Sequence, residues 1–323
     1  MNFQVHKMGV IFNPADYLET PDWMIDFAQA PNALVFNDKV RVYFCTRGKP
    51  DTDNMYVSRM AFIDLNKDNL SEIIGISSAP CLELGGLGEF DEFGTYPVSV
   101  LKDGEDIVAA YGGWTRCSSV PFNISIGIAK SRDRGRTFQK LGCGPVLSPY
   151  CSEPFVITSP KLRRFNGRYV LSYTSGVKWV VDEQGRPEII YKLRIAFSDD
   201  LVSWDRLERN IIEDRLGREE AQACPDIFYK KGLYHMFYCY RDAFDFRNNP
   251  DNSYRIGYAT SPDLMEWRRD DEKISDLDRS DVGWDSEMVA YPHCFEVNGR
   301  IYLLYGGNGN GKTGIGLAEI EGF

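Results

Sequence analysis

The stretch ACPDIFYKKGLYHMFYCYR, residues 223–241, places an apolar run after a proline, then a short turn that contains glycine, then a second run rich in tyrosine. Two alternating runs joined by such a turn predict a β-hairpin. The same plan recurs in QAPNALVFNDKVRVYFCTR (29–47), TYPVSVLKDGEDIVAAYGG (95–113), TSPKLRRFNGRYVLSYTSG (158–176) and AYPHCFEVNGRIYLLYGGN (290–308). The chain therefore contains five copies of one hairpin.

The prolines of these hairpins are evenly spaced. They are Pro31, Pro97, Pro160, Pro225 and Pro292, separated by 66, 63, 65 and 67 residues. Convincing helical periodicity is nearly absent, which argues against a parallel α/β fold. Five units of three or four antiparallel strands predict an all-β, five-bladed β-propeller. We expect one domain over 1–323, with blades at about 27–80, 92–148, 155–213, 220–276 and 287–323, and with an N-terminal strand at about 5–14 that closes the ring.

Composition narrows the class of partner. The net charge of −10 argues against nucleic acid, because phosphate binding needs a basic surface. No apolar run approaches the length of about 20 residues that spans a membrane, and charged residues interrupt the N-terminal segment, so we expect a cytoplasmic protein without a membrane partner. Eight cysteines without a CxxC pair predict reduced thiols and no metal site, and we expect no cofactor. The oligomeric state stays open.

Two columns of charged residues accompany the repeat. Five residues before the prolines stand Asp26, Glu92, Phe155, Glu220 and Glu287. The ends of the second strands carry Arg47, Arg116 and Arg241. In a propeller these positions meet at one end of the central channel, where a concave site is expected. We expect the four carboxylates to be catalytic and the arginines, together with Tyr96, Gln222 and His293, to bind substrate; a solvated network of salt bridges is the alternative.

The chain resembles the five-bladed propeller glycosidases, which include the arabinanase and β-xylosidase, invertase and levansucrase, and mannoside phosphorylase families. APNALVF (30–36) is similar to the invertase segment DPNGLVY, and ACPDIF (223–228) is similar to ECPDLF. The resemblance implies an Asp nucleophile or base, a second Asp and a Glu acid. At those positions this chain has Ala30, Tyr96 or Thr95, and Ala223, with Ser159 at the position of the arabinanase Glu.

Three functions follow from these observations. The first is a glycoside hydrolase-like enzyme that cleaves a small saccharide or glycoconjugate, either neutral or anionic, in the central funnel, using the carboxylates that stand five residues before the prolines. The second is a phosphate-dependent glycoside phosphorylase, in which an arginine binds phosphate and one carboxylic acid suffices. The third is a carbohydrate-binding propeller without catalysis, because the fold alone does not decide function.

Overall fold

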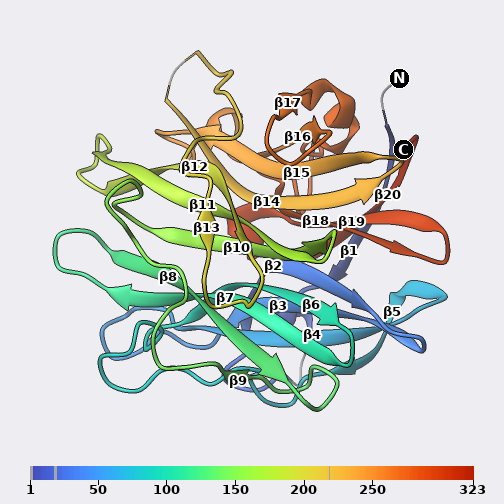
Figure 1. The fold of residues 1–323 in the computed structure, drawn as a ribbon, viewed down its shortest axis with the longest axis horizontal. Helices are drawn as coiled ribbons and strands as arrows, with labels where there is room; N and C mark the ends of the chain where they lie inside the picture. The colour runs from blue at the N-terminus through green and yellow to red at the C-terminus, as the bar shows by residue number, and fades with distance from the viewer. Residues whose placement is uncertain (1–2, 18–19, 218) are drawn as a thin grey trace.

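The computed structural model describes residues 3–17, 20–217 and 219–323, which form five four-stranded antiparallel sheets. In Figure 1 the sheets succeed one another in chain order, from blue and green through yellow to red. The all-β, five-bladed β-propeller predicted from the repeat is confirmed.

Each blade begins with one of the five proline-containing hairpins. Blade 1 consists of β2 (Asp26–Val35), β3 (Lys39–Arg47), β4 (Ser58–Asn66) and β5 (Asn69–Ile76). Blade 2 consists of β6 (Thr95–Asp103), β7 (Asp106–Arg116), β8 (Phe122–Ser131) and β9 (Gln139–Lys140), and blade 3 of β10 (Ile157–Phe165), β11 (Arg168–Val181), β12 (Pro187–Ser198) and β13 (Asp205–Arg206). Blade 4 consists of β14 (Glu220–Lys230), β15 (Leu233–Asp242), β16 (Arg255–Ser261) and β17 (Arg268–Arg269), and blade 5 of β18 (Ala290–Val297), β19 (Arg300–Gly306), β20 (Ile315–Glu321) and β1 (Gln4–Phe12). The described helical elements are short: η1 (Pro14–Asp16), η2 (Pro250–Asn252), η3 (Asp271–Leu277) and α1 (Asn308–Gly311). Within the described ranges, no helix is long and apolar enough to cross a membrane.

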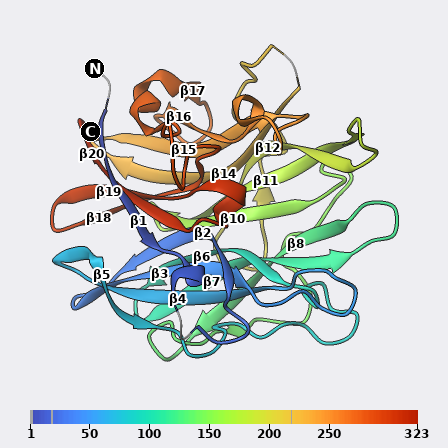
Figure 2. The ribbon, with the colours of Figure 1, turned by 180° about the vertical axis from the view of Figure 1, so that it is seen from behind.

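The N-terminal strand closes the ring, as predicted. β1 pairs with β20 in antiparallel register from Gln4 opposite Glu321 to Phe12 opposite Ile315. Both chain ends therefore lie at blade 5, with β1 alongside β20 in Figure 2. Closing the ring with strands from both ends gives the last sheet its outer strand and ties the termini together.

The register of every first strand breaks at its proline. The breaks lie between Gln29 and Asn32, Thr95 and Val98, Thr158 and Lys161, Ala223 and Asp226, and Ala290 and His293. In four blades the residue before the proline is left-handed, with φ of 51° at Ala30, 50° at Ser159, 55° at Cys224 and 57° at Tyr291, whereas the Tyr96–Pro97 bond of blade 2 is cis. A β-bulge redirects the side chain at the break. Each first strand thus leaves the regular ladder at its proline, at the same place in all five blades.

Apolar contacts between neighbouring blades form the core. One buried cluster joins blades 1 and 5, others join blades 4 and 5, 2 and 3, and 3 and 4, and a further cluster extends from blades 1 and 2 to the axis. The last of these contains Ala30, Tyr96, Cys224 and Tyr291, all from the bulges. The bulge residues therefore form the closed floor of the channel.

Candidate functional site

A cavity of about 470 Å³ opens above this floor and is lined by residues of all five blades. Its base includes Tyr96, Ser159, Cys224 and Tyr291, and its walls carry aromatic side chains such as Trp114 and Trp179. A concave site of this size with a few polar groups among aromatic residues suits a small molecule. We call this cavity the funnel.

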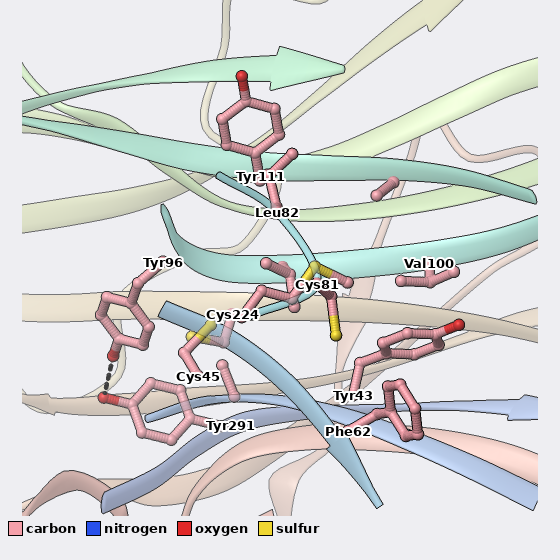
Figure 3. Packing of buried hydrophobic residues seen from close by; sticks show 14 of the residues in the cluster. Tyr43, Cys45, Phe62, Cys81, Leu82, Tyr96, Val100, Tyr111, Cys224 and Tyr291 are labelled. Atoms are coloured by element: carbon pink, nitrogen blue, oxygen red, sulfur yellow. Dashed lines mark hydrogen bonds between the residues drawn. The ribbon is translucent and has the colours of Figure 1, made fainter. Parts of the chain in front are cut away.

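The floor of the funnel is centred on two tyrosines. The hydroxyls of Tyr96 and Tyr291 are hydrogen-bonded at 2.7 Å and face each other in Figure 3. The indole nitrogen of Trp114 donates to the carbonyl of Tyr96 at 2.6 Å, which fixes the wall to the floor. Burial raises the pKa of both tyrosines well above the ordinary value. The floor therefore presents neutral phenols at physiological pH.

A buried polar network lies directly beneath the floor. Asp226 accepts from Arg163 Nη2 at 2.7 and 2.9 Å and from the backbone nitrogen of Cys294 at 2.7 Å. His293 Nδ1 lies 3.2 Å from Asp226 Oδ2, and its Nε2 is buried without a partner among the described atoms. Burial would raise the pKa of Asp226, but Arg163 and His293 outweigh it and hold that pKa well below the usual range. His293, predicted to bind substrate, is thus placed below the residues that line the funnel.

Arg47 and Arg241 are the predicted arginines that line the funnel. The Arg47 guanidinium lies 4.4 Å from the ring centre of Phe27, and its Nε donates to Ser58 at 3.2 Å. Arg241 is 2% exposed and donates to the carbonyls of Ile189, Asp242 and Ala243. Neither forms an ion pair with a carboxylate of the described chain. Buried cations normally have such a partner, so the funnel wall carries positive charge that is not neutralised locally.

The other predicted binding residues are placed differently. Tyr96 is in the floor, as described above. Arg116 does not line the funnel, because its guanidinium pairs with Asp51 and Asp53 of the loop between β3 and β4. Gln222 is buried away from the funnel, where its Nε2 donates to Glu220 at 2.8 Å.

The four carboxylates predicted to be catalytic do not converge. Glu287 lines the funnel and is exposed, and its backbone nitrogen donates to Asn308 at 2.7 Å. Glu220 is fully buried and pairs with Arg269 at 2.7 Å. Asp26 accepts from the nitrogen of Phe27, Glu92 accepts from the nitrogen of Gly88, and neither lines the funnel. A catalytic role for each of the four stays a prediction.

Glu188 is a funnel carboxylate that the sequence reasoning missed. It stands near the start of β12, in the long hairpin of blade 3, and both of its oxygens accept from Arg247, at 2.8 and 3.1 Å. The hairpin also brings Trp179 and Ile189 to the funnel wall. Glu188 does not stand at a fixed distance from one of the five prolines, so comparing equivalent positions of the repeat does not reveal it. The two strands of this hairpin, β11 and β12, have 14 and 12 residues, and this unusual length is the signal that the hairpin extends beyond its blade to the funnel.

Comparison with solved structures shows which fold this chain shares. A GH130 protein, from the work entitled "The GH130 family of mannoside phosphorylases contains glycoside hydrolases that target beta-1,2 mannosidic linkages in Candida mannan", superposes with a TM-score of 0.73 at 16% identity, over 99% of this chain and 94% of the other. The complex of BT0996 with RGII gives 0.72 at 17%, over 97% and 91%, and the GH32 β-fructofuranosidase BmSUC1 of Bombyx mori gives 0.63 at 16%, over 98% and 61%. The fold is therefore that of the five-bladed propeller glycoside hydrolases.

Sequence comparison places the chain in a family. It is 33% identical over 317 residues, 98% of either chain, to the uncharacterized proteins Rv1502 and MT1551 of Mycobacterium tuberculosis, from strains H37Rv and CDC 1551. The chain belongs to the same family as these proteins. No family model matches it.

Proposed function

We propose that this protein is a glycoside hydrolase-like enzyme whose funnel binds a small saccharide carrying an anionic group. The observation that carries the proposal is the presence in one aromatic funnel of Arg47 and Arg241, which lack a described carboxylate partner, and of two carboxylates, Glu188 and Glu287. Aromatic side chains such as Trp114 and Trp179 supply flat apolar surfaces for a sugar ring. The fold shared with glycoside hydrolases supports a sugar as the ligand.

The two arginines of the funnel, Arg47 and Arg241, support an anionic group on the ligand. A guanidinium presents several donors in a planar fork that matches a carboxylate or a phosphate. Arg47 is half-buried on Phe27, so its orientation is restrained before a ligand arrives. Arg241 is too deeply buried for broad contact with a ligand, and its charge acts mainly through the field in the funnel. A local positive field is compatible with the overall charge of −10.

Glu287 and Glu188 are the carboxylates we assign to bond cleavage. Glycoside hydrolysis needs one carboxyl group as proton donor and another as nucleophile or base. Both oxygens of Glu188 accept from Arg247, which holds the carboxylate in one orientation and suits the nucleophile or base. Glu287 is exposed at the funnel, where the leaving group of a bound saccharide can reach it, and we assign it as the proton donor. None of the five residues that precede the prolines carries a carboxylate: they are Ala30, Tyr96, Ser159, Cys224 and Tyr291.

Phosphorolysis is the second candidate, and the same arginines favour it. If Arg47 binds inorganic phosphate beside the sugar, phosphate replaces water and a single carboxylic acid is sufficient. The name of the GH130 neighbour includes mannoside phosphorylases. The two candidates differ in one measurable respect, the requirement for inorganic phosphate.

Binding and turnover are tested separately. Isothermal titration with uronic acid, sugar phosphate and matching neutral saccharides is expected to favour the charged ligands. Arg47→Gln is expected to weaken their binding about 10- to 100-fold, since a hydrogen bond to a charged group contributes ~1.5–3 kcal/mol. The control Arg116→Gln, which removes an arginine outside the funnel, is expected to change it less than about twofold. Equal affinity for neutral and charged ligands would refute the anionic substrate.

Turnover of the bound saccharides is then followed with and without inorganic phosphate. We expect product from the wild type and a loss of at least 100-fold in both Glu287→Gln and Glu188→Gln, with binding retained. Product that depends on phosphate establishes the second candidate. If the saccharides bind tightly but no product forms with or without phosphate, the protein is a carbohydrate-binding propeller and the enzymatic part of the proposal is wrong.

A further inference from the structure

Cys224 brings a thiol to the floor of the funnel. Of the cysteines in the described chain, it is the one that lines the cavity. Its backbone is left-handed at the bulge, and its nitrogen donates to Thr174 Oγ1 at 3.1 Å. The sulfur lies 3.4 Å from the hydroxyl of Ser159. Cys224 is therefore held at a site that small molecules reach through the funnel.

A second thiol, that of Cys239, lies immediately behind the first. Cys239 is on β15, directly opposite Ala223 of β14, so Cys224 is the bulged residue next to this pair. Cys239 Sγ lies 3.4 Å from the carbonyl oxygen of Ala223, the residue directly before Cys224, so the two cysteines are neighbours across the β14–β15 ladder. Cys239 is 1% exposed and does not line the funnel. One thiol thus faces the cavity and the other is shielded by it.

The charge around the pair favours Cys224 as the reacting thiol. Lys161 lies beneath the floor, 3% exposed, and its ammonium donates to the carbonyl of Pro31 at 3.1 Å. Burial would raise the pKa of Cys224, but hydrogen bonds with Cys239 and Ser159 and the charge of Lys161 lower it below the ordinary value. Burial raises the pKa of the other buried thiols, which are Cys45, Cys81, Cys239 and Cys294. The thiolate is the nucleophilic form, so Cys224 is expected to react first.

We propose that Cys224 and Cys239 form a modification site that reacts with peroxides. The Cys224 thiolate attacks one oxygen of the peroxide, the O–O bond breaks, and the sulfur becomes a sulfenic acid while the other oxygen leaves as water or an alcohol. The Cys239 sulfur then attacks the sulfenic sulfur, the S–O bond breaks, and water leaves as the Cys224–Cys239 disulfide forms. The two electrons lost by the thiols reduce the peroxide. The site rests on the adjacency of the two cysteines in the β14–β15 ladder and on the place of Cys224 in the cavity wall, and it does not depend on the saccharide assigned to the funnel.

Peptide mapping tests the proposal on the whole protein. The exposed cysteines are first replaced together, as Cys117→Ser, Cys143→Ser and Cys151→Ser, so that intermolecular linkage does not interfere. The folded protein is treated with hydrogen peroxide, alkylated in denaturant and digested with trypsin without reduction. Cys224 then lies in the peptide 219–230 and Cys239 in 232–241. We expect these two peptides to be linked and to separate on treatment with dithiothreitol.

Two further variants make the result decisive. Cys239→Ala is expected to stop the reaction at the Cys224 sulfenic acid, which dimedone traps, whereas Cys294→Ala, which removes another buried thiol, is expected to leave the linkage unchanged. In the native protein we expect iodoacetamide to modify Cys224 at least 10-fold faster than Cys45 or Cys294. Recovery of both peptides as free thiols after peroxide, or linkage of Cys224 to a cysteine other than Cys239, would overturn the proposal, and the wild-type chain gives this answer even if a variant does not fold.

Discussion

Acidification is expected to destabilise the propeller through His293. Burial lowers the pKa of this imidazole from 6.5 to about 4, an effect that Asp226 opposes and Lys161 supports. The unfolded chain therefore takes up a proton as the pH falls below 6.5, while the folded chain stays unprotonated until the pH approaches 4. The stability contributed by the neutral histidine is complete above pH 6.5 and is lost toward pH 4. A difference of about 2.5 pKa units corresponds to a total loss of ~3.5 kcal/mol, at ~1.4 kcal/mol per unit, of which ~3 kcal/mol is reached at pH 4.

Urea unfolding at several pH values between 7 and 4 measures this loss. The wild type is expected to show a free energy of unfolding that falls by ~3 kcal/mol more than that of His293→Asn over the same range. His6→Asn is the control, because it removes an exposed histidine of β1 and leaves His293 in place. Asp226 does not contribute within this window, because its pKa is depressed in the fold and its stabilisation is lost only below the ordinary value of 3.8. If the wild type and His293→Asn lose stability in parallel, the pKa assigned to His293 is wrong.

Three further predictions concern the structure around the funnel. Removal of residues 1–12 deprives β20 of its partner and should abolish the single cooperative thermal transition seen by circular dichroism; a truncated chain that melts like the full chain would contradict the closing role of β1. Asp226→Ala removes a fully buried carboxylate, leaves the partly buried Arg163 unpaired and should cost ~3–5 kcal/mol in urea, against less than about 1 kcal/mol for the more exposed Asp103→Ala, and equal costs would argue against a strong pair. Tyr96→Phe leaves the hydroxyl of Tyr291 without its partner and should cost ~1–3 kcal/mol, of which adding Tyr291→Phe should recover part, whereas strictly additive losses would show that the two hydroxyls do not interact.

The fold could be predicted because each repeat is marked by prolines and turn residues that are close together in the sequence. Pro31 and its four equivalents mark every first strand, and Gly167, Gly232 and Gly299 mark tight turns at positive φ. The closing strand followed from the incomplete last unit. Each of these signals depends on neighbouring residues in the chain, which a single sequence displays.

The placement of the site residues depends on contacts that the repeat does not display. The carboxylates five residues before the prolines would share one face only if each first strand alternated regularly, but the bulges add a residue to each of these strands, and β2 has a second break between Asp26 and Gln29. Arg116 stands at the predicted strand end, yet its direction is set by Asp51 and Asp53 in a loop 63 to 65 residues away. Glu220 meets Arg269 across 49 residues. Such pairings are tertiary, and no local pattern specifies them.

The backbone conformation of the bulges does not depend on a carboxylate side chain at these positions. A left-handed residue other than glycine costs about 1–2 kcal/mol, and this chain adopts the conformation with alanine at position 30 and cysteine at position 224. The cost is therefore sustained without any carboxylate at the bulge, and the hairpins hold the floor in place whichever side chain stands there. Ala30 and Ala223 stand at the bulges of blades 1 and 4 and are 1% and 6% exposed, so Ala30→Asp and Ala223→Glu would place carboxylates there at the cost of burying a charge. The two substitutions therefore measure what a carboxylate at the bulge changes in ligand binding when the backbone around it stays the same.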